Sequence, residues 1–460
     1  MSTKHSIAAA KFLKDRDKVN HHNQTFWSVR VKRDKMRDDV PEWEELREMA
    51  SELKLYSNSH LDELLVEFEK NATANGAIVH WAKDAEEYRD IIFSILKSHD
   101  VRSFVKSKSM LSEECELDPF LISKGIDTIE TDLGERILQL MKLPPSHIVM
   151  PAIHITKEQV GDTFREKMDA EPGNNDPTYL THVARRNLRN LFLHADAAMT
   201  GANFAIASTG DCVVCTNEGN ADMGMSSPKL NITAFGIDKI VPNQEAMGVL
   251  TRLLARCGTG QPTTTYTSHF RGPRLGGEYH IIIVDNGRSK ILGQADHYKL
   301  LNCMRCGACM NTCPVYRRTG GYSYTYFIPG PVGINLGMAH NPDKYYDNVS
   351  ACTLCLSCQN VCPVKIDLGE QIYKWRQKMD DFGHANKEKK LMSKGLKYIF
   401  EHQGLYETAL TLAPIANGLP RFMLYNGLNA WGKGHEMMKF PKESFNKMWK
   451  NHEVQGKEEK

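Results

Sequence analysis

Apolar residues recur at helical spacing in the first seventy residues, most clearly from Trp43 to Phe68, where glycine and proline are scarce. Charged residues fill the positions between them, as in the run at 30–35. This pattern predicts an N-terminal helical arm over residues 1–70.

From residue 71 to residue 290, short apolar runs alternate with amphipathic segments. The run at 76–81 is typical of a buried strand, and Asp84 with Glu87 then resembles the start of a capped helix. The apolar residues between 88 and 96 fall on one face of that helix. Repeated strand–helix units predict an α/β domain, with flanking helices packed on a mostly parallel or mixed sheet.

The same reading locates the remaining elements. Further strands are predicted at 101–105, 148–153, 202–207, 232–235 and 279–284, and helices at 157–168, 179–194 and 243–256. A turn at Asp285-Asn286-Gly287 closes the α/β domain, so we expect it to span 71–290. A cysteine-rich, mainly helical domain is expected at 291–380, and a Lys-rich helical extension at 381–460.

Composition narrows the function classes. Hydrophobic content of 41% and charged content of 25% are ordinary for a globular protein, and 460 residues favour several domains. A net charge of +2 offers no field to attract nucleic acid, so no nucleic-acid partner is expected. The N-terminus is not expected to be a secretory signal, and no apolar run is long enough to span a bilayer. We predict a cytoplasmic protein without an integral membrane segment; the apolar stretch 405–431 leaves open a peripheral contact at the inner face of the membrane.

The chemistry lies in a duplicated cysteine pattern. C-x-x-C-x-x-C-x-x-x-C-P begins at Cys303 and recurs at Cys352, which is the spacing of proteins that hold two 4Fe-4S clusters. Three cysteines at steps of three wrap a loop around one cluster, and the fourth turns toward the other cluster. The predicted ligand sets are Cys303, Cys306, Cys309 and Cys362 for one cluster, and Cys352, Cys355, Cys358 and Cys313 for the other.

Two alternatives to redox clusters stay open. Paired C-x-x-C units also form four-thiolate zinc sites, although zinc needs neither the third cysteine nor the C-P ending. Clusters can also be purely structural. The remaining cysteines, including the pair Cys212 and Cys215, are expected to be buried and inert.

Weaker signals lie in the α/β domain. Glycine turns near Gly201, Asn203 and Glu218 flank a predicted strand, where α/β domains form clefts. His269 is expected in a polar loop. No G-x-G-x-x-G opens a strand–helix unit, so a dinucleotide in the usual fold is unsupported, and no catalytic residue can be named.

The chain resembles the lactate utilisation protein B family, the iron-sulfur subunits of a bacterial system that oxidises L-lactate to pyruvate. The likeness is carried by residues 107–114, 130–135, 145–149, 200–204, 264–268 and 285–289, and by both cysteine quartets. It implies an α/β domain with the fold of sugar-phosphate isomerases and CoA transferases, followed by a ferredoxin-like dicluster domain. Family members often carry serine at the position of Cys352, so ligation by Cys352 is predicted from spacing alone.

The resemblance further implies an electron-transfer subunit that allows growth on lactate, with lactate utilisation proteins A and C as partners and an unidentified downstream electron carrier. It is not expected to act as a stand-alone enzyme. The alternative is an enzyme acting on an acyl or phosphorylated ligand in the α/β domain, near Gly201, Asn203 and Glu218, with structural clusters. A redox or iron sensor is a third hypothesis, and the lack of a basic patch argues against direct promoter binding.

Overall fold

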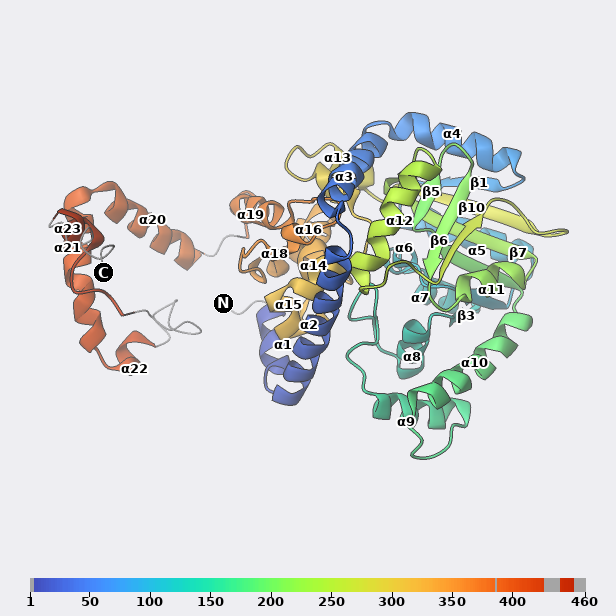
Figure 1. The fold of residues 1–460 in the computed structure, drawn as a ribbon, viewed down its shortest axis with the longest axis horizontal. Helices are drawn as coiled ribbons and strands as arrows, with labels where there is room; N and C mark the ends of the chain where they lie inside the picture. Colours follow the sequence, from blue (N-terminus) through green and yellow to red (C-terminus); the bar gives the residue numbers. More distant parts are fainter. Residues whose placement is uncertain (1–3, 385–386, 426–438, 451–460) are drawn as a thin grey trace. The chain divides into compact units, whose positions relative to one another are not determined.

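The computed structural model describes residues 4–384, 387–425 and 439–450 (Figure 1). The chain divides into two compact units, residues 1–382 and 383–460. The first unit contains the α/β layers, the cysteine motifs and the helices that precede them.

A six-stranded parallel sheet forms the centre of the α/β layers. Its strands in spatial order are β1 (Ile78–Ala82), β10 (Glu278–Val284), β7 (Leu230–Gly236), β4 (Ala197–Gly201), β2 (Ser103–Lys106) and β3 (Asp127–Glu130). Every residue of β7 is buried, as expected for a parallel sheet covered on both faces. The predicted α/β class is therefore confirmed.

Helices cover both faces of this sheet. They are α4 (Leu61–Ala74), α5 (Ala85–Ser98), α6 (Met110–Glu114), α7 (Leu117–Ser123), α8 (Leu133–Met141), α10 (Pro177–Leu193) and α11 (Asn220–Ser226). Helix α9 (Lys157–Met168) packs on α8 and α10, and α12 (Gln244–Gly258) packs against α2, α3 and β5. Alternate residues of β10 separate the layers: Ile281 packs with α4, whereas Ile282 packs with α5 and α7. Asp84 caps α5 as predicted, accepting the amides of Glu86 and Glu87.

A second, four-stranded sheet has the order β8 (Ile240–Val241), β5 (Phe204–Ile206), β6 (Asp211–Thr216), β9 (Tyr266–Phe270). The predicted strand at 202–207 belongs to this sheet. The loop predicted around His269 was wrong, because residues 266–270 pair antiparallel with β6 and His269 Nδ1 lies 3.2 Å from Asp211 Oδ2.

The strand predicted at 148–153 was also wrong, since this segment is a series of bends and turns. Pro151 has no amide to donate to a sheet, and the amides of Val149 and Met150 donate instead to His147 Nδ1 at 3.1 and 3.0 Å. Ile148 packs into the same core as the cysteine motifs. An apolar run was mistaken for a strand because its partners are distant in sequence.

The helices before the α/β layers are α1 (Lys4–Phe12), α2 (Arg16–Asp38) and α3 (Trp43–Ser59). The pattern read as continuous from Trp43 to Phe68 breaks at His60, where α3 ends and α4 begins. Helix α2 packs against α14 and α15 of the cysteine-rich region. The N-terminal helices therefore support the cysteine motifs directly.

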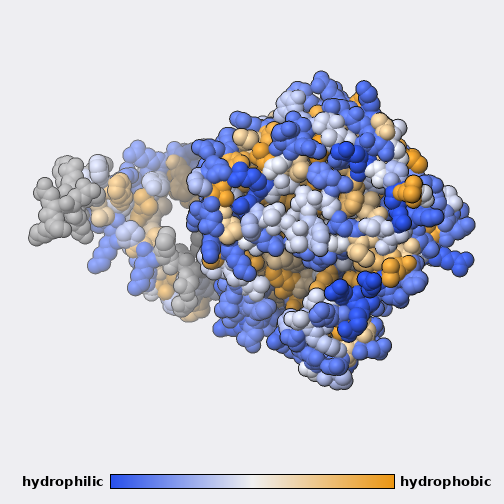
Figure 2. All heavy atoms as spheres, turned by 45° about the vertical axis from the view of Figure 1, so that its right-hand side comes forward, coloured by the Kyte–Doolittle hydropathy of each residue, from blue (hydrophilic) through white to orange (hydrophobic). Residues whose placement is uncertain are grey.

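The cysteine-rich region follows the turn at Asn286 and Gly287, whose φ angles of 42° and 84° are left-handed. Its helices are α13 (Arg288–Leu292), α14 (Ala308–Thr312), α15 (Pro314–Thr319), α16 (Gly330–His340), α17 (Pro342–Tyr345), α18 (Ser357–Asn360) and α19 (Leu368–Lys378). They share one hydrophobic core with α2, α3 and α12. The face of the first unit in Figure 2 is mainly hydrophilic, with small apolar patches.

The second unit contains α20 (Lys387–Glu401), α21 (Gln403–Leu412), α22 (Arg421–Leu424) and α23 (Phe445–Lys450). Several of its large apolar side chains are exposed, including Leu391, Phe400 and Phe422. Of the apolar stretch 405–431, residues 426–431 lie outside the described residues, as do 451–460. No helix in the described parts of the chain is long and apolar enough to cross a membrane.

Candidate metal centre and the adjoining cleft

The two cysteine motifs fold into loops of the same shape. Arg305 and Leu354, each two residues after the first cysteine of its motif, have left-handed φ angles of 60° and 54°. Their amides donate to Cys303 Sγ at 3.4 Å and to Cys352 Sγ at 3.3 Å. The sequence repeat is therefore also a repeat of backbone conformation, which turns each first sulfur toward the inside of its loop.

A second left-handed residue follows in each loop, Gly307 with φ 79° and Leu356 with φ 60°. Each directly precedes a short helix, α14 or α18, and these two helices pack against each other. Contact between the helices brings the loops together, so that a cysteine of one motif can reach the centre of the other.

Four cysteines from different motifs surround one cavity: Cys303, Cys306, Cys309 and Cys362 line it together with apolar side chains. Burial raises the pKa of the Cys362 thiol to about 12, and its neighbour Cys303 adds to this effect. Cys362 belongs to the second motif, so the structure places it with the first three cysteines of the other motif. We refer to these four cysteines as the inner group.

The other four cysteines, Cys313, Cys352, Cys355 and Cys358, form the outer group. Burial raises the pKa of Cys313 to about 11, and the neighbouring Cys352 and Cys355 add to this effect. The pKa of Cys358 is raised by burial and then by the other three thiols of the group. Cys313 thus lies near cysteines of the second motif, and the exchange of fourth ligands expected from the spacing stays a prediction.

The chemistry of these buried thiols fits ligation of an iron-sulfur cluster, whose iron ions would stabilise the thiolate form. Buried thiols with raised pKa values are poor anions by themselves, and metal binding is what stabilises the thiolate. Among the described residues, no three His, Cys, Asp or Glu side chains gather closely enough to hold a single metal ion. Zinc would need its sulfurs at about 2.3 Å from one centre, whereas a cube of four irons is ligated at separate corners.

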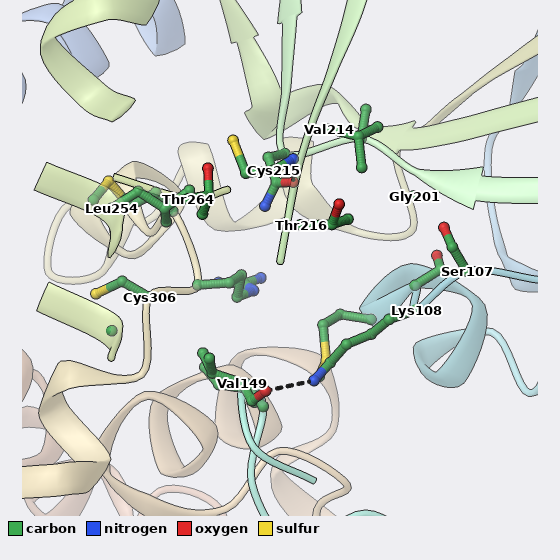
Figure 3. Close-up of a pocket in the computed structure, with 18 of the residues that line it drawn as sticks. Ser107, Lys108, Val149, Gly201, Val214, Cys215, Thr216, Leu254, Thr264 and Cys306 are labelled. Atoms are coloured by element: carbon green, nitrogen blue, oxygen red, sulfur yellow. Dashed lines mark hydrogen bonds between the residues drawn. The ribbon is translucent and has the colours of Figure 1, made fainter. Parts of the chain in front are cut away.

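A cleft of about 320 Å³ lies beside the inner group (Figure 3). It opens at the carboxyl ends of β2, β4 and β7, where parallel α/β sheets bind ligands. Gly201, Asn203 and Glu218, predicted from the sequence to flank a cleft, all line it. Met304 and Cys306 from the first cysteine motif complete its wall.

Comparison with known proteins agrees with these two parts. Residues 65–291 match the LUD domain and residues 299–366 match the 4Fe-4S dicluster domain. Lactate utilization protein B of Geobacillus thermodenitrificans is 42% identical over 388 residues, covering 82% of this chain and 81% of the relative. That of Bacillus cytotoxicus is 38% identical over 439 residues, covering 92% and 91%. The chain belongs to the lactate utilization protein B family.

Two further comparisons complete the picture. An uncharacterized electron transport protein of Escherichia coli, YkgF, is 36% identical over 441 residues, covering 93% of this chain and 92% of the relative. A solved structure of a DUF162 family protein from Deinococcus radiodurans matches 49% of this chain and 98% of its own, at 15% identity and a TM-score of 0.28. The family predicted from the sequence is therefore confirmed by the relatives of similar length.

In this family member, two arginines that were not predicted, the buried Arg47 and the half-buried Arg376, fix the backbone of both groups. Arg47 of α3 donates to the carbonyl of Cys362 at 2.8 and 3.0 Å and to that of Asn360 at 3.1 Å. Arg376 of α19 donates to the carbonyl of Cys352 at 2.5 Å and to that of Val349. Arg47 lies 315 positions from Cys362, so no local sequence signal could have revealed it. Both guanidinium groups also place positive charge near sites that would carry negative charge.

The charged residues of the cleft were missed for the same reason. Arg288 binds Glu114 at 2.9 and 3.0 Å and Asp238 at 2.6 Å. Burial alone would raise the pKa of Asp238, but Lys239 and Arg288 hold it well below its usual range. This buried network joins α6, the turn after β7 and α13, and so fixes one end of the cleft.

Proposed function

We propose that this chain is the iron-sulfur electron-transfer subunit of a complex that oxidises L-lactate to pyruvate and so allows growth on lactate. The observation that supports this most directly is the division of eight cysteines into two groups that exchange their fourth members. Two 4Fe-4S clusters held in this way would supply single-electron transfer between partners.

In this proposal the eight cysteines have one role, ligation. The inner group would hold one cluster and the outer group the other. The amides of Arg305 and Leu354, already bonded to the first sulfur of each group, would stabilise its negative charge. Cys309 neighbours Cys303 and Cys362 of its own group and Cys358 of the other, which favours electron transfer between the groups.

The names of the relatives support the physiological context. Several relatives at 37–42% identity are named lactate utilization protein B, and one is named an electron transport protein. We propose lactate utilization proteins A and C as the partners and an unidentified carrier as the electron acceptor. Lactate oxidation itself would take place on a partner, because the cysteine groups offer no acceptor for a hydride.

Anaerobic reconstitution tests the proposal. The purified chain should contain about eight irons and eight sulfides, with a visible absorption that bleaches on reduction. L-Lactate should bleach it only when proteins A and C are present. Zinc in place of iron, or bleaching by lactate with this chain alone, would contradict the proposal.

The cleft supports a second candidate function, an enzyme of the α/β domain that acts on an acyl or phosphorylated ligand. Gly201, Asn203 and Glu218 line one cavity, as this alternative requires. If it holds, Cys309→Ser should lower stability while the full-length protein keeps its turnover of such a ligand. Loss of electron transfer with no acyl or phosphoryl turnover in either protein would contradict this second candidate.

A further inference from the structure

The cleft and the inner cysteine cavity share a wall. Ile148, Met304 and Cys306 line both, so a single layer of side chains separates them. In Figure 3, Cys306 lies across the cleft from Ser107 and Gly201, with its sulfur directed away from the cleft. A ligand in the cleft would therefore lie directly beside the inner group.

Arg305 connects the two cavities. It lines the cleft, while its own amide donates to Cys303 Sγ at 3.4 Å. Its left-handed φ of 60° is part of the repeated cysteine loop, so the loop determines where its side chain begins. Within the described residues, its buried Nη1 atom has no hydrogen-bond partner. A buried guanidinium nitrogen without a partner is costly, and an anionic ligand would satisfy it.

Lys108 supplies a second positive charge. It lies two residues after Lys106, the last residue of β2, and its Nζ atom donates to the carbonyl of Val149 at 3.0 Å (Figure 3). Its nearest carboxylate atom is Glu135 Oε1, at 3.8 Å. Burial and then the neighbouring Glu113 raise the pKa of Glu135 to about 8, so both effects disfavour a charged carboxylate beside Lys108. Among the described residues, Lys108 Nζ therefore donates no hydrogen bond to a carboxylate.

The other charged groups of the cleft are engaged. Arg288 is neutralised by Glu114 and Asp238, and Lys239 donates to Asp238 at 2.7 Å. Asp132 caps α8 by accepting the amide of Glu135. The remaining acid, Glu218, is exposed as a residue, but burial of its carboxyl group and then Asp132 raise its pKa, whereas nearby Lys108 lowers it. Lys108 and Arg305 are thus the cations of the cleft that donate no hydrogen bond to a carboxylate of the described chain, although Cys303 and Asp238 lie near Arg305.

Two polar atoms extend the site. Asn220 is 6% exposed, and its Oδ1 atom has no partner within the described residues, although its amide nitrogen donates to Thr131. The hydroxyl of Thr216 is likewise buried without a partner in the described chain. Both residues line the cleft. An acceptor and a hydroxyl near two cations suit a ligand that has a hydroxyl or carbonyl beside its carboxylate.

We infer that the cleft binds a small hydroxy or oxo carboxylic acid, with its carboxylate between Lys108 and Arg305, and that this binding is coupled to reduction of the inner group's cluster. The inference depends on the proposed function for the presence of that cluster. It adds a ligand site on this chain itself, distinct from the site where a partner oxidises lactate.

The sign of the coupling follows from charge. An electron added to the inner group and a carboxylate across one layer of side chains repel each other, so the bound acid lowers the reduction potential. By linkage, reduction weakens binding of the acid by the same factor. We expect about a tenfold change in affinity, which corresponds to about 59 mV for one electron.

Binding is measured on the anaerobic full-length holoprotein by calorimetry, with oxidised and dithionite-reduced samples. The probes are pyruvate, L-lactate, acetate, inorganic phosphate and the neutral analogue lactamide. We expect pyruvate or lactate to bind more tightly than acetate, about tenfold more tightly to the oxidised protein, and lactamide and phosphate not to bind. Equal affinity in both redox states, or binding of lactamide or phosphate as tight as that of the acids, would overturn the inference.

Variants identify the site. Lys108→Gln should weaken binding of the acid at least tenfold and abolish the ligand-dependent shift in an EPR-monitored redox titration, with iron content unchanged. Lys374→Gln, an exposed change on α19, should leave both measurements as in the wild type. Equal loss of binding in the two variants would place the acid elsewhere and overturn the inference.

The two proposals can fail separately. A protein with about eight irons and normal EPR signals that binds none of these acids overturns the cleft site and leaves the electron-transfer function standing. Arg305→Gln gives a second check, because it removes the guanidinium group that would bind the carboxylate close to Cys303. If that variant retains its iron and also retains the full affinity and the redox dependence of binding, the inference is wrong.

Discussion

The inner and outer cysteine groups have the same loop but different surroundings. In the inner group, Cys306, Cys309 and Cys362 are buried, and the cleft lies behind them. In the outer group, Cys355 is exposed and Cys352 is half-buried. Exposure and nearby charge tune the potential of an iron-sulfur site, so we expect the two sites to differ in potential.

This difference also suggests a direction for electron transfer. The inner group borders a cleft that can take a small ligand, whereas the outer group reaches the surface through Cys355. An electron exchanged with a partner protein would therefore pass through the outer group. The same local motif thus gives two sites with different surroundings, because the tertiary structure packs around them differently.

The largest effect should come from separating the two groups by mutation. Cys358 and Cys362 belong to one motif but to different groups, so Cys358→Ala should remove the outer cluster and Cys362→Ala the inner one. Each variant should keep about four of eight irons. Iron analysis and an EPR redox titration should show that Cys358→Ala loses the signal of the outer cluster and Cys362→Ala that of the inner cluster. Loss of the same signal in both variants would refute the exchange of fourth ligands.

Arg47→Ala should be the most destabilising change outside the cysteines. It leaves the carbonyls of Cys362 and Asn360 without a buried, charged donor, which we expect to lower the free energy of unfolding by about 3 kcal/mol. Thermal unfolding of the anaerobic protein measures this. The matched variant Arg376→Ala, at the half-buried outer group, should lower the free energy of unfolding by less than Arg47→Ala does. An equal or larger loss of unfolding free energy in Arg376→Ala would contradict the expectation that burial makes Arg47 the more important of the two arginines.

Gly307→Ala tests the left-handed position of the inner loop. The added Cβ would lie 3.1 Å from His147 Cε1 and 3.2 Å from Val149 Cγ2, at a φ of 79°. We expect a loss of about 1–2 kcal/mol in the free energy of unfolding. The equivalent outer residue, Leu356, already carries a side chain in this conformation, so Leu356→Gly should change stability by less than about 1 kcal/mol. Similar losses in both variants would show that the surroundings of the inner loop do not matter.

The smallest effect concerns pH. Burial and then Lys108 lower the pKa of His147 to about 3, and its neutral ring accepts two amides and faces Asn311 Oδ1 at 3.1 Å. The unfolded chain binds this proton below about pH 6.5, whereas the folded protein does not, so its contribution to stability is lost as pH falls from about 6.5 toward 3.

At pH 5.5 this contribution should lower the free energy of unfolding by about 1 kcal/mol. Comparing unfolding at pH 7 and pH 5.5 for the wild type and for His147→Gln isolates it. The variant should lose less stability over this interval, and equal losses would remove His147 as the cause.

Much of the fold could be predicted from local pattern. The helix at 157–168 is present with the predicted bounds, and β1, β2, β7 and β10 lie where apolar runs predicted them. Local pattern failed at 148–153. This apolar run contains Pro151 and packs against the core of the cysteine motifs without forming a strand, and its apolar residues alone do not distinguish the two arrangements. Strands β3 and β4 were missed, although they are as long as the predicted strands β2 and β1.

The sequence by itself determined the eight cysteines, their spacing and the repeated loop, because three cysteines at steps of three act over a few residues of backbone. Tertiary structure alone brought Arg47 to Cys362, and Lys108 and Arg305 to one cleft beside Cys306. These contacts join residues separated by up to several hundred positions. Only the packing of helices α2 and α3, the sheet edge and the cysteine loops against one another places such residues together, and no local pattern records that packing.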